Sequence, residues 1–147
     1  MKTPELSELC DLIEESCGLR PETDPEIDPE ADLLEELEIW GDDVHALLAD
    51  FARRYDVDMS GYLGYFHTGE EGGGIGNLFV KTPHDRVPYI PITLSLLQEA
   101  ARLKRWPIDY PPHTLPRYRW DTIITWLFTG GLLLWLISGL LWKLLAG

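Results

Sequence analysis

The 147-residue chain is poor in cysteine and in basic residues. Its two cysteines, Cys10 and Cys17, lie seven positions apart on one predicted helix, about 10 Å along its axis, which is too far for a disulfide between them. Two thiols that are not joined in a disulfide suit a reducing cytoplasm. With 12 basic against 25 acidic residues the net charge is −13, which disfavours nucleic acid and anionic lipid through repulsion.

The negative charge is concentrated in the first part of the chain. Residues 1–58 hold 19 of the 25 acidic and 4 of the 12 basic groups, a net charge of −15, whereas the remainder holds 6 acidic and 8 basic groups, a net charge of +2. An acidic face of this kind favours a protein partner with a basic surface. The alternative is a solvated surface that only keeps the domain soluble.

The N-terminal region has no recognisable signal peptide and reads directly as an acidic amphipathic helix. Thr3 and Pro4 are suited to the cap and first position of that helix, and Gly18 to its end. Its expected buried stripe consists of Leu6, Leu9, Cys10, Ile13 and Cys17. A long acidic loop over residues 19–32 should follow, and Leu33, Leu34 and Leu37 should then pack under a helical bundle.

The clearest helix in the chain begins at Asp42 and Asp43 and runs for about four turns. Its apolar residues recur at the spacing of a helix buried along one face; they are Val44, Leu47, Leu48, Phe51 and Tyr55. The two aspartates suit the positive end of the helix dipole and can accept from free amide groups there.

The entry Ile39-Trp40-Gly41-Asp42-Asp43 and the exit Tyr55-Asp56-Val57-Asp58 carry a family resemblance. This helix resembles the second helix of acyl carrier proteins. It is still more similar to an uncharacterised bacterial family of carrier-protein-like domains with an Ile-x-Gly-Asp-Asp entry, over roughly residues 5–106. The resemblance implies a small acyl-carrier-protein-like helical bundle.

A carrier protein needs a serine at the start of this helix to hold its phosphopantetheine arm. Aligned on the helix exit, that serine falls at Gly41, and no serine or threonine occupies any position from Leu33 to Tyr55. The resemblance therefore implies the carrier fold without the covalent carrier activity, and no cofactor is expected.

Three irregular features follow Asp58. Tyr62, Tyr65 and Phe66 either plug the open end of the core or form a recognition surface, since exposed tyrosines suit protein interfaces. The glycine-rich segment over residues 69–77 lacks the Lys-Ser/Thr of a phosphate-binding loop and is expected to be a flexible turn. Asn77–Thr82 and Arg86–Ile92 are expected to pair as a short β-ribbon, with the second as an edge strand because of its prolines.

A last bundle helix is expected after Thr93, which suits its cap, with Ile92 packing onto Leu97. Its core-facing residues should be Leu94, Leu97, Ala100 and Ala101, and Trp106-Pro107 should stop it.

The predicted organisation is a cytoplasmic carrier-like domain at residues 1–106, a proline-rich linker at 107–119 and an anchor at 120–147. The fold class is therefore mainly α, with a short β-ribbon and one transmembrane helix.

The anchor contains a run from Thr122 to Trp142 without a charged residue. A helix of this length matches a hydrocarbon core about 30 Å thick, and tryptophans lie toward both ends in the manner of an aromatic belt. A buried helix of a soluble protein is the alternative. Five basic residues lie within the 20 positions before the run and one follows it, which places the N-terminal domain in the cytoplasm and the anchor in the inner membrane; they are Arg102, Lys104, Arg105, Arg117, Arg119 and Lys143.

The sequence offers no catalytic or metal-binding pattern. The four histidines, His45, His67, His84 and His113, have no recognisable ligand or catalytic partners, and the carboxylates are dispersed. The protein is therefore not expected to be an enzyme.

The first hypothesis is a membrane-tethered module that binds an unknown protein partner through residues of the acidic helix and aromatic loop; they are Trp40, Asp42, Asp43, Asp50, Tyr62 and Tyr65.

Two other functions stay open. The first is a genuine acyl or aminoacyl carrier that is modified at another hydroxyl, such as Ser60. The second is a small inner-membrane regulator or immunity-like protein in which the transmembrane helix itself performs the recognition. Dimerisation within the membrane through Gly130, Gly131, Ser138 and Gly139 is a further option, although no GxxxG spacing is present.

Overall fold

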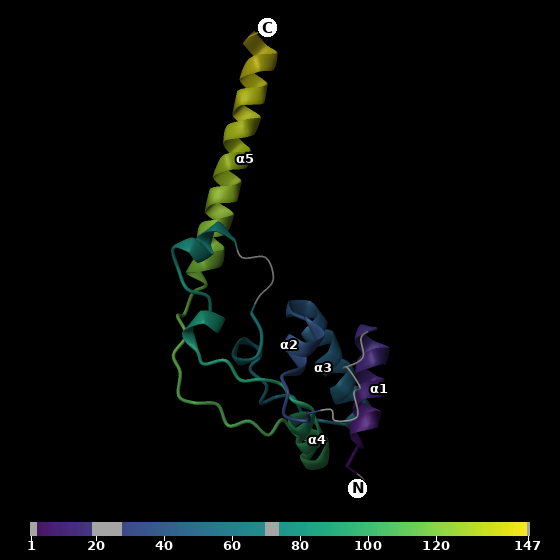
Figure 1. Cartoon of the computed structure of the whole chain (residues 1–147). Helices are drawn as coiled ribbons and strands as arrows, with labels where there is room; N and C mark the ends of the chain where they lie inside the picture. Colours follow the sequence, from purple (N-terminus) through teal and green to yellow (C-terminus); the bar gives the residue numbers. More distant parts are fainter. Residues whose placement is uncertain (1–2, 19–27, 70–73, 147) are drawn as a thin grey trace.

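A computed structural model describes residues 3–18, 28–69 and 74–146. Its α-helices are α1 (Leu6–Cys17), α2 (Leu33–Leu37), α3 (Gly41–Tyr55), α4 (Leu94–Leu103) and α5 (Trp120–Ala146). Three short 3₁₀ helices, η1 (Gly64–Phe66), η2 (Ile75–Leu78) and η3 (His84–Arg86), lie between α3 and α4. Helices α1 to α4 gather at the N-terminal end of the molecule, and α5 extends away from them (Figure 1).

Helix α1 begins two residues later than the sequence indicated. Its N-cap is Glu5, and Thr3 and Pro4 precede the helix. Glu5 and Glu8 form a capping box, in which each side chain accepts from the other residue's amide, so two otherwise free amides are satisfied. Gly18 ends the helix at φ 69°, as expected. Leu9, Cys10 and Ile13 of the predicted stripe are buried together with Leu12.

The predicted pattern of α3 is confirmed. Val44, Leu47, Leu48 and Phe51 are buried, and Tyr55 packs partly buried against the same core. Leu33, Leu34 and Leu37 are also buried, as expected, and they form the short helix α2, which Asp32 caps by accepting from the Leu34 amide. Helix α1 packs against α3 and α4, so the expected small helical core is present.

Helix α4 is capped by Thr93, whose hydroxyl accepts from the Leu96 amide at 3.1 Å. Leu94, Leu97, Ala100 and Ala101 are buried, as predicted. The helix ends at Leu103, before Trp106 is reached, and its C-cap Lys104 adopts the left-handed conformation. An isolated β-bridge then joins Arg105 to Asp58, so the Tyr55–Asp58 exit of α3 is fastened to the end of α4.

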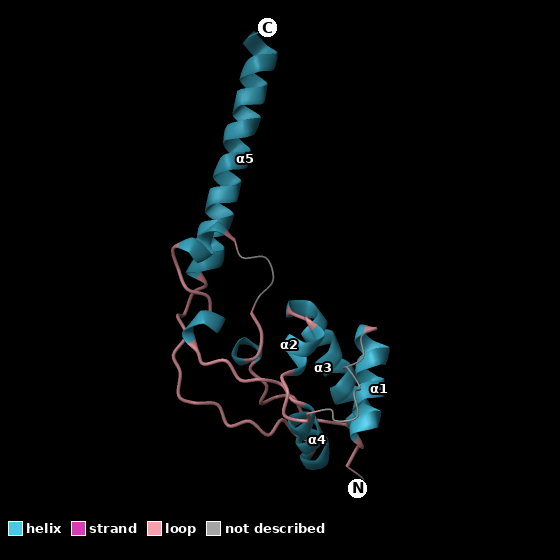
Figure 2. Cartoon of the chain, viewed as in Figure 1, coloured by secondary structure: helices cyan, strands magenta, loops and turns pink. Residues whose placement is uncertain are grey.

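The predicted β-ribbon is wrong: the described part of the chain contains no β-strand (Figure 2). The segment meant as its first strand begins within η2, and the second begins with the last residue of η3. Pro83 precedes η3, and Pro88 and Pro91 have no amide hydrogen to give to a ladder. Of the predicted flexible turn, residues 70–73 lie outside the described residues, while Gly74 to Leu78 form the start and body of η2.

Helix α5 is longer than the predicted run, and its residues from Trp120 to Leu145 are long and apolar enough to cross a membrane. None of its most apolar stretch is buried against the rest of the chain, which argues against a core helix of a soluble protein. Large side chains along it face solvent in this structure, among them Trp126, Leu133, Leu134 and Trp142. Such a surface is consistent with membrane association.

The proline-rich segment after Trp106 begins with contacts to the domain. Ile108 and Tyr110 pack partly buried against the core. Farther along the segment, Pro111 to Leu115 are exposed. The domain boundary near residue 107 remains a prediction, and these contacts extend the packed part of the chain to Tyr110.

Candidate functional site

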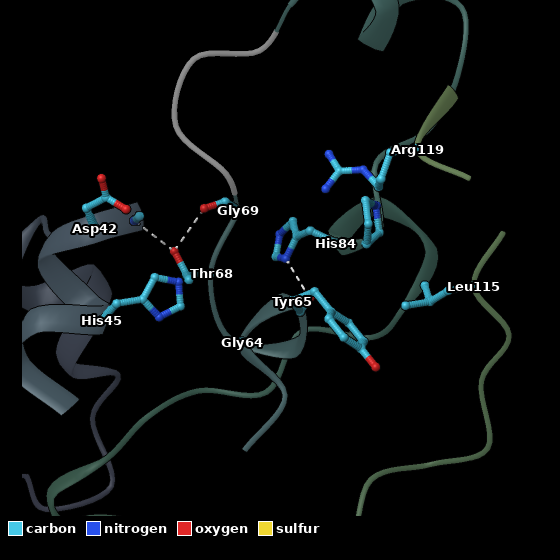
Figure 3. Close-up of a pocket in the computed structure, with 11 residues that line it drawn as sticks. Asp42, His45, Gly64, Tyr65, Thr68, Gly69, His84, Leu115 and Arg119 are labelled. Atoms are coloured by element: carbon cyan, nitrogen blue, oxygen red, sulfur yellow. Dashed lines mark hydrogen bonds between the residues drawn. The ribbon is translucent and has the colours of Figure 1, made fainter. Parts of the chain in front are cut away.

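A cavity of about 450 Å³ lies at the start of α3 (Figure 3). Segments that are distant in sequence form its walls. They are the first turn of α3, η1 with the residues after it, Pro83 with His84 at η3, and Leu115 with Arg119, which both precede α5. The side chains that give it polarity are Asp42, His45, Tyr65, Thr68, His84 and Arg119. The acidic helix α3 and the segment that leads to α5 therefore both contribute to this cavity.

Gly41 and Thr68 determine the backbone at this helix start. Gly41 has φ 51°, a left-handed conformation that costs a residue with a Cβ atom more than it costs glycine. Its amide donates to the hydroxyl of buried Thr68 at 3.2 Å, and that hydroxyl donates to the Gly69 carbonyl. Thr68 thus satisfies a free amide of the helix N-terminus from 27 residues away in sequence.

The two cavity histidines are held by different contacts. The Nδ1 of His84 donates to the Tyr65 carbonyl at 3.1 Å, so its Nε2 is unprotonated in the neutral ring. His45 is exposed, and its ring lies edge-on to Tyr62. Arg119 is paired with the buried carboxylate of Asp121 at 2.6 Å. Among the described residues no three His, Cys, Asp or Glu side chains gather as metal ligands.

The residues predicted to bind a partner fall into three places. Trp40, the N-cap of α3, has 48% of its surface exposed, and Asp42 and Asp43 beside it are exposed. Asp50 lies two turns further on, where it accepts from the Ser16 hydroxyl at 3.0 Å and pairs with Arg53. We call Trp40, Asp42 and Asp43 the α3 entrance, because they form one exposed group beside the cavity.

The two tyrosines of the predicted set are only partly exposed. The Tyr62 ring stacks on His67, with centroids 5.3 Å apart, and lies edge-on to Trp106. Burial raises the pKa of Tyr62. The Tyr65 hydroxyl contacts Nε2 of His113 at 2.7 Å. This packing favours the core-plugging interpretation for Tyr62, and a role of either tyrosine in partner binding remains a prediction.

An aromatic network that the sequence did not reveal closes this end of the domain. The Tyr110 hydroxyl accepts from the Leu63 amide at 3.1 Å and from Nε1 of Trp106 at 2.8 Å. Its own proton is then available for Nε2 of His67, at 2.7 Å. The Nδ1 of His67 donates to the Ile90 carbonyl at 2.7 Å. His67 is fully buried, and every polar atom of its ring has a partner only while the ring is neutral.

This network makes the stability of the domain depend on pH. Burial lowers the pKa of His67 from its ordinary 6.5, against smaller raising effects of the Ile90 carbonyl and Asp32. Unfolding therefore takes up a proton below about pH 6.5, and the free energy of unfolding should fall as pH drops from 7.5 to 5.5. The slope from one proton is at most about 1.4 kcal/mol per pH unit. Urea unfolding of the full chain in detergent at several pH values measures it.

The matched control for this effect is a substitution at an exposed histidine. His67→Gln should flatten the pH dependence, while His45→Gln should leave it as in the unsubstituted chain. An equal slope in all three proteins would show that His67 does not cause the effect.

Comparisons with known proteins give a family and no activity. Residues 6–109 match the family described as "Protein of unknown function (DUF1493)". The matched segment covers α1 to α4 and ends one residue before Tyr110. The curated proteins contain no match, and neither do the solved structures.

Proposed function

The chain belongs to the DUF1493 family, and, because that description carries no activity, we propose a function from the geometry: a membrane-tethered module that binds a protein partner through the α3 entrance. The partner should present a basic surface. The tether is α5, which would cross the bilayer once. The domain would act by binding and not by chemistry.

The observation that carries this proposal is the composition of the α3 entrance. A half-exposed tryptophan adjoins two exposed carboxylates on the first turn of a helix whose other face is buried. Tryptophan is enriched among the residues that contribute most to protein interfaces, and the flanking charges steer a basic partner into place. The Thr68 cap fixes the backbone of this turn, so little ordering is required on binding.

The carrier-like interpretation of the domain belongs to the same proposal. Carrier proteins dock through an acidic second helix, and α3 with its buried stripe is the corresponding element here. Gly41 occupies the position of the modified serine, and its positive φ disfavours a side chain there. The resemblance thus supports a domain that docks onto a partner protein and carries no phosphopantetheine arm.

Two alternative functions have specific tests. Ser60 is exposed, and its hydroxyl donates to Asp58 at 3.0 Å; an added mass after co-expression with a phosphopantetheinyl transferase would make the protein a genuine carrier. If α5 performs the recognition, as in a membrane regulator or immunity-like protein, exchanging α5 for an unrelated transmembrane helix should abolish function. The proposed module should keep its partner after that exchange.

The orientation follows from charge. Arg102, Lys104, Arg105, Arg117 and Arg119 precede α5, and Lys143 lies near its end. The positive-inside rule then supports a cytoplasmic position for the domain at the inner membrane.

Charge reversal tests the proposed surface. Asp42→Lys with Asp43→Lys should weaken partner binding about tenfold or more, because two exposed attractions of some 0.5–1 kcal/mol each become repulsions. Binding should also weaken with rising salt, since exposed charges are screened within about 10 Å at 0.1 M. Affinity purification from detergent-solubilised membranes, quantified by mass spectrometry, measures the effect.

A second acidic pair supplies the control. Glu35→Lys with Glu36→Lys makes the same change in net charge at exposed adjacent residues of α2. Partner recovery should survive in this variant. Equal losses in the two variants would make net charge, and not the α3 entrance, the cause.

A further inference from the structure

Two large apolar side chains are exposed side by side at the end of η2. Leu78 has 80% of its surface exposed and Phe79 has 72%. We call this pair the η2 patch. Single exposed apolar residues are ordinary on protein surfaces, but two adjacent and nearly fully exposed ones indicate a contact that the isolated chain lacks.

The η2 patch is fixed to the base of α5. The Gly76 amide donates to the Thr125 hydroxyl at 3.0 Å, and that hydroxyl donates to the Asp121 carbonyl at 2.9 Å. A Cβ atom on Gly76 would overlap the Asp121 carbonyl, and one on Gly74 would overlap Thr125. The two glycines therefore permit a backbone-to-helix contact, and Figure 1 shows η2 beside the first turns of α5.

The attachment point determines the depth of η2 relative to a bilayer. Thr125 lies four residues beyond Asp121, which is about 6 Å along the helix axis. Asp121 forms an ion pair with Arg119, and a charged pair belongs at the level of the lipid headgroups. An element bonded to Thr125 is then at the boundary between headgroups and acyl chains, where peripheral apolar elements insert about 5–10 Å.

The backbone of η2 is suited to that environment. The Asn77 amide donates to the Gly74 carbonyl at 3.0 Å, and the Phe79 and Val80 amides donate to the Gly76 carbonyl at 3.0 and 2.9 Å. Amides with protein acceptors cost little when water is removed. Lys81 and Arg86 follow and are exposed, so these two cationic side chains can bind lipid phosphates.

We propose that Leu78 and Phe79 insert into the leaflet that α5 enters, so that the η2 patch is a second membrane contact beside the transmembrane helix. The proposal rests on the proposed function, because it requires α5 to cross the bilayer. Two contacts restrict tilting of the domain more than one helix does. The α3 entrance would then be held at a defined height and orientation above the lipid.

Spin labels on the full chain test the insertion. In a Cys10→Ala/Cys17→Ala background, Phe79→Cys carries the label, with Leu133→Cys in the middle of α5 and Ala46→Cys on the exposed side of α3 as references. The chains are reconstituted into vesicles of phosphatidylcholine and phosphatidylglycerol at 3:1. Oxygen, which partitions into lipid, should increase the spin-relaxation rate of the labels at Phe79 and Leu133 several-fold more than a water-soluble nickel chelate does. At Ala46 the nickel chelate should have the larger effect.

The reference labels distinguish a failure of the membrane anchor from a failure of the insertion of the η2 patch. A water-exposed label at Leu133 would overturn the proposed membrane anchor itself. A lipid-exposed label at Leu133 with a water-exposed one at Phe79 would overturn only the insertion of the η2 patch. Adding Gly76→Val should move the Phe79 label toward water and leave the Leu133 label in lipid, because η2 can no longer approach α5.

A second measurement avoids the cysteine replacements. With both native cysteines kept, p-benzoylphenylalanine replaces Phe79 or, in a separate chain, Leu133, and illumination in the same vesicles precedes mass spectrometry. Lipid adducts are expected from both positions. Adducts from Leu133 alone would overturn the insertion.

Discussion

A chain that ends at Arg119, and therefore lacks α5, should leave the membrane pellet almost completely and appear in the supernatant of lysed cells. The span from Thr122 to Trp142 contains eleven Leu, Ile and Phe residues, each worth about 0.3–0.6 kcal/mol in a membrane helix. Together they supply roughly 5 kcal/mol, or between about three and four orders of magnitude in partitioning. High-speed centrifugation with an alkaline carbonate wash and immunoblotting measures the distribution.

An exchange of helices controls for indirect effects of the truncation. A chain in which an unrelated transmembrane helix replaces α5 should return to the pellet. If the full-length chain itself were released by the carbonate wash, α5 would not be a membrane anchor.

Phe51→Ala should destabilise the domain by about 3–5 kcal/mol, the range for removing a large aromatic side chain from a core. Phe51 is completely buried on α3, and its ring lies 5.3 Å from that of Tyr55. A small domain has a total stability of about 5–15 kcal/mol, so the variant should lose a large part of its stability and unfold at a markedly lower urea concentration. Urea unfolding of the full chain in detergent, followed by circular dichroism, gives the difference.

Leu103→Ala is the matched control, since Leu103 lies on α4 with 37% of its surface exposed. Truncation of this side chain should lower the free energy of unfolding by no more than about 1 kcal/mol. Equal destabilisation by the two substitutions would contradict the placement of Phe51 in the core.

The helices could be predicted because their signals are local. The stripe of α3, the threonine cap of α4 and the apolar length of α5 are all contained in short segments, and each is present. The β-ribbon failed because the structure of residues 74–80 is determined by a contact with α5 that spans 49 residues. Short apolar segments without a strong period carry no information about such a partner.

One part of the candidate site could be predicted from the sequence, and the other part could not. Trp40, Asp42 and Asp43 are neighbours in the sequence, so their grouping could be predicted. The opposite wall of the cavity comes from Tyr65, His84 and Arg119, and no sequence spacing places these beside α3.

The aromatic network shows the same limit. His67 is buried by Tyr110, which is 43 residues away. The prolines on either side of Tyr110 predict a linker at this position. A tryptophan directly before the prolines, Trp106, and a tyrosine among them, Tyr110, are the available signal that this segment packs against the domain.

The most direct test of partner binding at the α3 entrance is photocrosslinking in intact cells from p-benzoylphenylalanine in place of Trp40. The account predicts one dominant protein adduct, which is lost when Asp42→Lys and Asp43→Lys are added and is absent when the probe replaces Leu103 on α4. No protein adduct from Trp40, or the same adduct from both positions or after charge reversal, would contradict it.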